Sequence, residues 1–334
     1  MKKSLLAVLL SAAAVLMLSS CRSTIENMAF KSIAGMLSAP DSSGVFTSDD
    51  DPVLIGDALP LALKLYEMML EKDPGNADLM AVTGKNFVMY SGAFVQMPAD
   101  MLEDQYWREA DKGRKRAKKL YKRGRDYILG ALDLKHEGFL KALNSSDYSS
   151  ITDVLDAEDT DNLYWAAMGW LGMVSTDPMD MELLTTVDKP LMLLYRAMQL
   201  DDSVSAVHTA MIQVNLSVPS SAIATMREKC PALSSFIDDY YNKAGVGKSP
   251  AERAEFHFNK AVELSSGQDP SPYINMATAL CVKTQNVESF RNYLEKALEI
   301  NPDDNPESKL MIVVYQDKAN WLLEHVEDFF LVDF

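Results

Sequence analysis

Apolar residues in this chain recur mostly at spacings of three and four, which places them on one face of an α-helix. The clearest stretch runs from Asp57 to Phe94. Its first half carries Ala62, Tyr66 and Met69 on one stripe, and Pro74 ends the helix. The second half predicts another amphipathic helix, whose small and apolar positions are Met80, Thr83, Gly84 and Phe87. The pair is spaced like a tetratricopeptide repeat, a helix–turn–helix unit of about 34 residues.

Echoes of this unit recur towards the C-terminus. They are Ala62–Tyr66–Met69–Pro74, Ala117–Tyr121–Gly124, Pro190–Leu194–Ala197, Ala254–Phe258–Ala261 and Phe290–Leu294–Ala297–Pro302. The wider intervals between them indicate insertions at 97–115, 144–161 and 219–250. Stacked helix pairs share a continuous core and leave a concave side. The sequence therefore predicts an all-α fold of tetratricopeptide-like repeats stacked as a solenoid, with Leu310 to Phe334 as a C-terminal capping helix.

The N-terminus has the pattern of an export signal. Lys2 and Lys3 precede an apolar run from Leu5 to Leu18, and Ser19-Ser20-Cys21 follows. This ending looks like a bacterial lipobox, in which Cys21 becomes the lipidated first residue; an ordinary signal peptide with a chance cysteine is the alternative. We expect a lipoprotein signal peptide at 1–20, a lipidated N-terminus and tether at 21–45, and a helical-repeat domain at 46–334. The expected location is the bacterial periplasm, anchored to the inner or the outer membrane.

Charge and cysteine content narrow the possible partners. The net charge of −16 argues against general nucleic-acid binding. Two cysteines remain besides Cys21, and an exported protein could pair Cys230 with Cys281; the alternative is that both are unpaired, buried thiols. Nine Lys and Arg residues lie within 112–125. They fit either a solvated helix face or a docking patch for an acidic partner or anionic lipid headgroups.

The motifs of common enzymes are incomplete. Gly245-Val-Gly247-Lys248-Ser249 resembles the end of a phosphate loop, but Asn242 stands where the first glycine is needed. His136-Glu137 begins a zinc-protease pattern, and Leu140 replaces its second histidine. We therefore expect no catalytic residue, no metal and no cofactor. Asp49-Asp50-Asp51 before Pro52 is interpreted as a helix cap.

Aromatic residues gather in the helices expected to line the concave side. The candidates for the lining of a ligand-binding pore are Tyr90, Phe94, Tyr164, Trp165, Trp170, His208 and Tyr273. Together with the adaptable side chains of the 20 methionines, they could form an apolar channel with a few polar contacts. The alternative for each residue is an ordinary place in the core of a repeat.

Several segments, taken in order, resemble the T-component (TatT) lipoproteins of tripartite ATP-independent periplasmic (TRAP) transporters. They are Phe46–Pro52, Ala58–Pro60, Lys64–Glu67, Gly84–Gln96, Asp161–Trp165, Trp170, Arg196–Asp201, His208, His257–Ala261, Ser265–Gly267, Ser271–Tyr273, Gln285 and Trp321–Leu323. The likeness covers nearly the whole mature chain. It departs at Val204, where tryptophan is expected, and this puts the shape of the pocket in question.

The resemblance implies a non-catalytic, lipid-anchored scaffold that assembles as a homotrimer with a pore through each subunit. Its expected partners are the periplasmic solute-binding protein of the transporter and a small hydrophobic ligand that passes through the channel. The alternative function is a helical-repeat adaptor for envelope protein assembly that handles no ligand.

Overall fold

The computed structural model describes residues 44–331, and every regular element in that range is a helix, so the all-α prediction is confirmed. The longer helices are α3 (Pro52–Lys72), α4 (Ala77–Ser91), α6 (Trp107–Lys135), α9 (Thr160–Thr176), α11 (Asp188–Leu200), α12 (Ser205–Ser217), α13 (Ser220–Lys229), α14 (Pro231–Lys243), α15 (Pro250–Leu264), α18 (Val287–Leu298) and α19 (Lys309–Glu324). The shorter ones are α2 (Gly44–Thr47), α5 (Met97–Asp100), α7 (Phe139–Ser145), α8 (Tyr148–Thr152), α10 (Met181–Leu184), α16 (Ser271–Asn275) and α17 (Val282–Thr284). The predicted signal peptide, Cys21 and most of the tether lie outside the described residues.

Capping residues set the helix ends in the opening stretch. The carboxylate of Asp51 accepts hydrogen bonds from the backbone N–H groups of Val53 and Leu54, and Pro52 occupies the first turn of α3. The interpretation of the acidic triplet as a cap is therefore confirmed for Asp51. Asn76 caps α4 in the same way, through the N–H of Leu79.

Consecutive long helices pack on one another: α3 on α4, α4 on α6, α6 on α9, α9 on α11, and α12 on α15. Most echo residues are buried in these pairs, as Ala117, Tyr121 and Gly124 are in α6, whereas Ala62 and Phe258 are half-buried. The three predicted insertions are helical as well and contain α5, α8, α13 and α14. Regular stacking in tetratricopeptide register stays a prediction.

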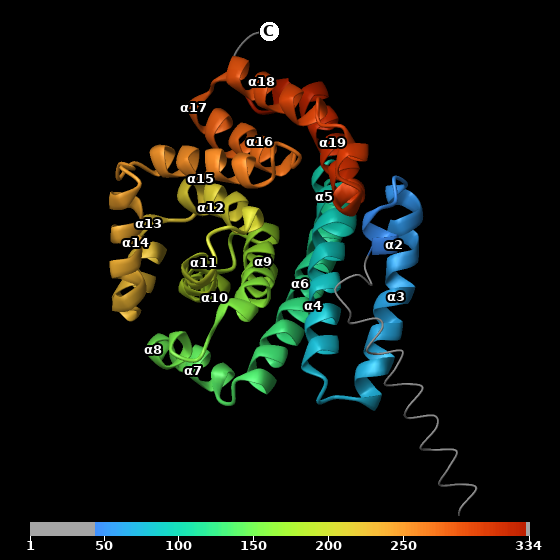
Figure 1. Cartoon of the computed structure of the whole chain (residues 1–334). Coiled ribbons are helices and arrows are strands. Elements are labelled where there is room, and N and C mark those ends of the chain that lie inside the picture. The colour runs from blue at the N-terminus through green and yellow to red at the C-terminus, as the bar shows by residue number, and fades with distance from the viewer. Residues whose placement is uncertain (1–43, 332–334) are drawn as a thin grey trace, which may run out of the picture.

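The C-terminal helix joins the two ends of the described chain. Helix α19 packs on α18 and also contacts α2 and α3 (Figure 1). An ion pair at 2.8 Å connects Lys309 Nζ at the start of α19 to Asp50 Oδ2 ahead of α3. The helices therefore follow a curved path that returns to its beginning, and α19 contacts the N-terminal helices as well as α18.

The basic run lies in α6 and is largely neutralised within the molecule. Six of its nine cationic side chains form salt bridges: Arg114, Lys115, Lys118, Lys122, Arg123 and Arg125. A seventh, Arg116, contacts the hydroxyl of Tyr90 at 3.1 Å. This pairing favours the solvated helix face over a docking patch.

Two further features bear on the predictions from sequence. Cys230 and Cys281 are free, buried thiols in separate core clusters, which agrees with the unpaired alternative. Between residues 44 and 331, none of the helices combines the length and the hydropathy needed to cross a membrane.

Candidate functional site

Side chains from three distant parts of the chain influence one another electrostatically. Tyr164 belongs to α9, Tyr315 to α19, and Asp269 lies in the turn between α15 and α16. Burial raises the pKa of Tyr164, and the negative charge of Asp269 adds to the rise. Burial, followed by the charge of Asp269, raises the pKa of Tyr315 to about 12. All three side chains keep some contact with solvent, so we define Tyr164, Tyr315 and Asp269 as the inner polar cluster.

Of the residues predicted for the pore, Tyr164 and Trp165 lie at this cluster. Their rings meet edge to face with centroids 5.4 Å apart, and both are half-buried. Trp170, one and a half turns further along α9, is buried instead. Its indole N–H donates to Thr186 Oγ1 at 2.9 Å, and the guanidinium of Arg125 lies over its ring at 4.4 Å. Trp170 is thus held in the core between helices.

Tyr90 and Phe94 form a separate pair at the end of α4. Their rings stack with centroids 5.9 Å apart, and Tyr90 is buried while Phe94 is half-buried. Phe94 sits in a π-helical turn, Gly92–Gln96, and packs closely on Gly56 of α3. Tyr90 belongs to the main core cluster, against which Tyr164 and Trp165 also pack, and Phe94 lies against α3.

His208 is fully buried and belongs to a chain of hydrogen bonds. Its Nε2 lies 2.8 Å from the carbonyl oxygen of Asp202, its Nδ1 lies 2.8 Å from Nδ1 of His257, and His257 Nε2 lies 2.8 Å from the Tyr241 hydroxyl. Because a carbonyl only accepts, His208 donates from Nε2 and accepts at Nδ1 from His257, which in turn accepts from Tyr241. Burial lowers the pKa of both histidines, so both stay neutral. Without exposed surface, His208 offers no group to a ligand in this conformation.

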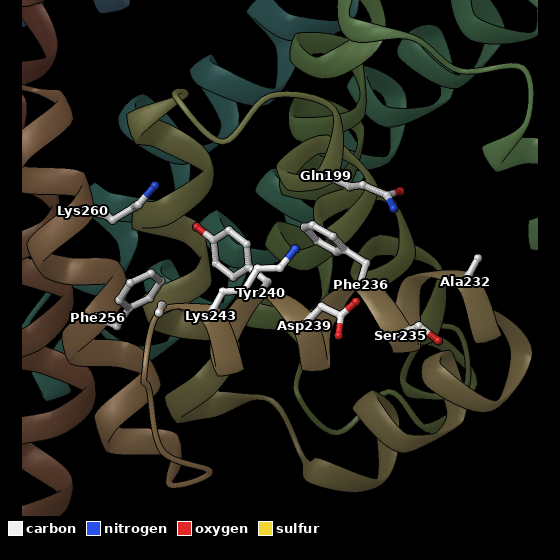
Figure 2. A pocket seen from close by; sticks show the side chains of 10 residues that line it. Gln199, Ala232, Ser235, Phe236, Asp239, Tyr240, Lys243, Phe256 and Lys260 are labelled. Carbon is white, nitrogen blue, oxygen red and sulfur yellow. The ribbon is translucent and has the colours of Figure 1, made fainter.

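An aromatic groove is lined mainly by residues of α14 and α15 (Figure 2). It lies next to the histidine pair, because the Tyr240 ring stacks on that of His257 with centroids 6.5 Å apart. Its volume is about 650 Å³, and it is lined by Gln199, Ala232, Ser235, Phe236, Asp239, Tyr240, Lys243, Ala244, Phe256 and Lys260. Tyr240 is the centre: its ring lies 5.5 Å from that of Phe236 and 5.8 Å from that of Phe256. The sequence analysis predicts an insertion at 219–250 and therefore misses this groove. The signal that could have found it is the spacing of Phe236 and Tyr240, which are four residues apart and lie on one face of α14.

Tyr273 lies in α16, shortly after Asp269 in the chain. It packs edge-on against Phe258, with centroids 5.2 Å apart, and lines a second hollow of about 510 Å³. Burial raises the pKa of Tyr273, and the charge of Asp269 adds to the rise. The predicted pore residues are therefore distributed over several surroundings, and the charge of Asp269 raises the pKa values of both Tyr273 and Tyr164.

Comparison with known proteins adds the family. The chain matches the family described as TRAP transporter T-component over residues 48–221 and 235–330. It belongs to this family. A protein of Treponema pallidum (strain Nichols), described as uncharacterized, is 32% identical over 300 residues, which cover 88% of this chain and 85% of that protein.

The family match includes every residue of the inner polar cluster and leaves out residues 222–234. That gap holds most of α13 and the start of α14, including Ala232 on the groove wall. Among residues 44–331, His, Cys, Asp and Glu side chains form no group of three able to hold a metal ion. T-components are accessory parts of a transport system, and this places the chain in transport rather than in a known class of enzyme.

Proposed function

We propose that this T-component is a periplasmic scaffold, lipid-anchored at Cys21, that docks the solute-binding protein of its transporter and passes a small hydrophobic ligand. The family match carries this proposal. The half-buried aromatic surface around Tyr164 and Trp165 supports ligand passage. An apolar ligand that leaves water against such a surface gains about 25 cal/mol per Å² of apolar area buried.

An exposed apolar stripe on α3 supports binding to a protein, including self-association as a homotrimer. The residues with this spacing are Leu54, Ala58, Leu61, Leu65 and Met68, and all are exposed. Their spacing of four, three, four and three keeps them on one side of the helix, opposite the buried stripe of Ile55, Leu59, Leu63 and Tyr66. Large exposed apolar patches mark interaction sites.

The alternative function, an adaptor for envelope assembly without a ligand, draws on the same stripe. Pull-down from membrane extracts with the full mature protein separates the two. Recovery of a TRAP solute-binding protein is the expected result. Recovery of outer-membrane or cell-wall machinery in its place would overturn the transport role.

Self-association is tested on α3. Leu61→Glu and Leu65→Glu place charges in the apolar stripe, and we expect them to lower the molecular mass measured by light scattering from that of a trimer. Lys64→Glu, on the exposed polar side of the same helix, is the matched control. A wild-type protein that is monomeric at all concentrations would refute the homotrimer.

Lipid anchoring is tested by Cys21→Ser. Acyl chains contribute about 0.8 kcal/mol per buried CH₂, so the variant should move from the membrane fraction to the soluble fraction. Ligand passage is tested by mass spectrometry of compounds extracted from the purified protein. If nothing apolar co-purifies, and Trp165→Ala and Tyr273→Ala keep full transport activity in cells, the ligand part of the proposal fails while the docking part stands.

A further inference from the structure

Three helices meet at a chain of hydrogen bonds that is closed to water. Tyr241 belongs to α14, His257 to α15 and His208 to α12, and their exposed fractions are 1%, 0% and 0%. The Tyr241 hydroxyl contacts His257, His257 contacts His208, and His208 contacts the backbone carbonyl of Asp202, each at 2.8 Å. One hydrogen bond therefore joins α14 to α15, and the next joins α15 to α12.

This arrangement fits neutral histidines. Because the carbonyl of Asp202 only accepts, each imidazole already uses one nitrogen as a donor and the other as an acceptor. A further proton on His208 Nδ1 would face the N–H of His257 across 2.8 Å. A further proton on His257 Nε2 would face the hydroxyl hydrogen of Tyr241. Either proton breaks or reverses a contact between two helices.

The charged groups around the pair also oppose an imidazolium. Lys260 acts on both histidines and Arg253 acts on His257, and both side chains are positive. Among the described residues, the carboxylate that acts on His208 is that of Asp202, and its Oδ2 already lies 2.8 Å from Nζ of Lys260. A buried charge without a free counter-ion is costly. The histidines therefore take up a proton more readily once the contact has opened to water.

The titratable neighbours from the adjoining helices are tyrosines. Tyr240 of α14 stacks on His257, and its hydroxyl donates to Asp202 Oδ2 at 3.3 Å. Tyr195 of α11 is buried beside Tyr241. Burial raises the pKa of Tyr240 and of Tyr195. Neither hydroxyl can supply a negative charge in the pH range in which histidine titrates.

Of the three helices, α14 is the one placed to move. It lies with α13 at the outer edge of the molecule (Figure 1). Its buried residues form one stripe, Leu233, Ile237 and Tyr241, whereas α12 is buried on most sides. Helices with few buried side chains open more easily than those in the core. The hydrogen bond from Tyr241 is thus one of few contacts that hold α14 in place.

The aromatic groove depends on the position of α14. Phe236 and Tyr240 line it from α14, and Phe256 lines it from α15 (Figure 2). Tyr240 precedes Tyr241 and Phe256 precedes His257, so the groove walls and the hydrogen-bonded residues lie on the same turns of the two helices. Separation of α14 from α15 therefore takes the groove apart.

We propose that the chain of Tyr241, His257 and His208 is an acid-sensitive latch that holds α14 against α15 and α12. While the histidines are neutral, α14 is docked and the groove is formed. In acid, the histidines take up protons as α14 moves away, because the separated imidazoles reach water. The groove is then lost while the rest of the fold persists. This device depends on neither the docking nor the ligand passage proposed above.

Hydrogen–deuterium exchange at pH 7 and pH 5 tests the latch on the full mature chain with Cys21→Ser. The docked state binds fewer protons than the open state, so its stability falls as the pH drops below the ordinary histidine pKa of about 6.5. For one histidine that titrates only in the open state, protection of the α14 amides should fall roughly 25-fold, after correction for intrinsic exchange rates. The amides of α6 should stay protected.

His257→Gln removes a titrating group and keeps a side chain that donates and accepts. Protection of α14 should then depend less on pH than in the wild type. If this variant does not fold, as judged by circular dichroism, Tyr241→Phe replaces it; without the hydrogen bond to His257, α14 should be less protected already at pH 7. Tyr293→Phe on α18 is the matched control and should leave α14 unchanged.

Three results would overturn the latch. The first is α14 protection that does not change between pH 7 and pH 5 in the wild type. The second is an equal loss of protection in α6, α9 and α14, which would mean that acid destabilises the whole fold. The third is a Tyr241→Phe variant that protects α14 as well as the wild type does at pH 7.

Discussion

The crossing of α4 and α6 depends on two glycines, and replacing either one tests how closely the first helices pack. A Cβ added at Gly84 would lie 2.6 Å from the carbonyl oxygen of Gly124 and 2.5 Å from Cγ1 of Ile128. A Cβ at Gly124 would lie 2.7 Å from the carbonyl oxygen of Gly84. Because the closest atoms include backbone, Gly84→Ala requires the helix axes to move apart by about 1 Å to restore van der Waals contact.

Two effects of opposite sign set the magnitude. Overpacking of a well-packed core typically costs about 1–3 kcal/mol. Alanine in place of glycine stabilises a helix interior by about 1 kcal/mol at most. We therefore expect Gly84→Ala to lower the free energy of unfolding by about 1–2 kcal/mol, which corresponds to a fall in Tm of roughly 2–6 °C.

Thermal unfolding followed by circular dichroism is the assay, with Gly130→Ala as the control in the same helix pair. The Cβ at Gly130 would meet only the sulfur of Met80, at 2.9 Å, and that flexible side-chain end can move away. Its Tm should stay unchanged or rise. If Gly84→Ala and Gly130→Ala have the same Tm, close backbone approach is not the reason for glycine at Gly84.

Three further predictions concern buried and paired groups. The buried histidines have lowered pKa values, so the unfolded state binds more protons below its ordinary pKa of about 6.5 and stability should fall as the pH drops below that value. Tm between pH 7 and 5 should depend less on pH in His257→Gln than in the wild type, and an equal dependence would contradict this explanation. Lys118 forms ion pairs with Asp177 and Asp180, at 2.7 Å each. Lys118→Met should therefore lower the free energy of unfolding, measured by urea titration, by about 1 kcal/mol or less, and this loss should shrink in high salt. A loss that is unchanged or larger in high salt would contradict the ion-pair explanation. Trp170→Phe keeps the aromatic packing and removes the hydrogen bond to Thr186, so it should cost about 1 kcal/mol in the same titration, and a loss of less than a few tenths would mean that this bond contributes little.

The sequence predictions that are confirmed, the all-α class and the family, rest on patterns among residues close together in the chain. Helical spacing identifies the all-α class because every helix must bury one stripe, and Ala117 and Gly124 lie on such a stripe in α6. Whether Tyr164 and Trp165 line a pore stays a prediction. The family itself was recognisable from short segments in order.

The polar half of the candidate site was not predictable in this way. Asp269 is a single acidic residue in a turn, and turns carry no hydrophobic period that would mark it. Its charge raises the pKa values of Tyr164 and Tyr315, which belong to α9 and α19, and this effect arises only after the chain has folded.

By itself, the sequence determined the class of secondary structure, the starts of helices such as α3 and the family, because capping and periodicity act between residues a few positions apart, whereas the predicted C-terminal helix to Phe334 ends at Glu324. Only the tertiary structure decided which aromatic residues share a surface, that His208 is buried against His257, 49 residues away, and that α19 returns to α2 and α3. The physical reason is that burial and electrostatic coupling depend on distance in space, which the packing of whole helices sets.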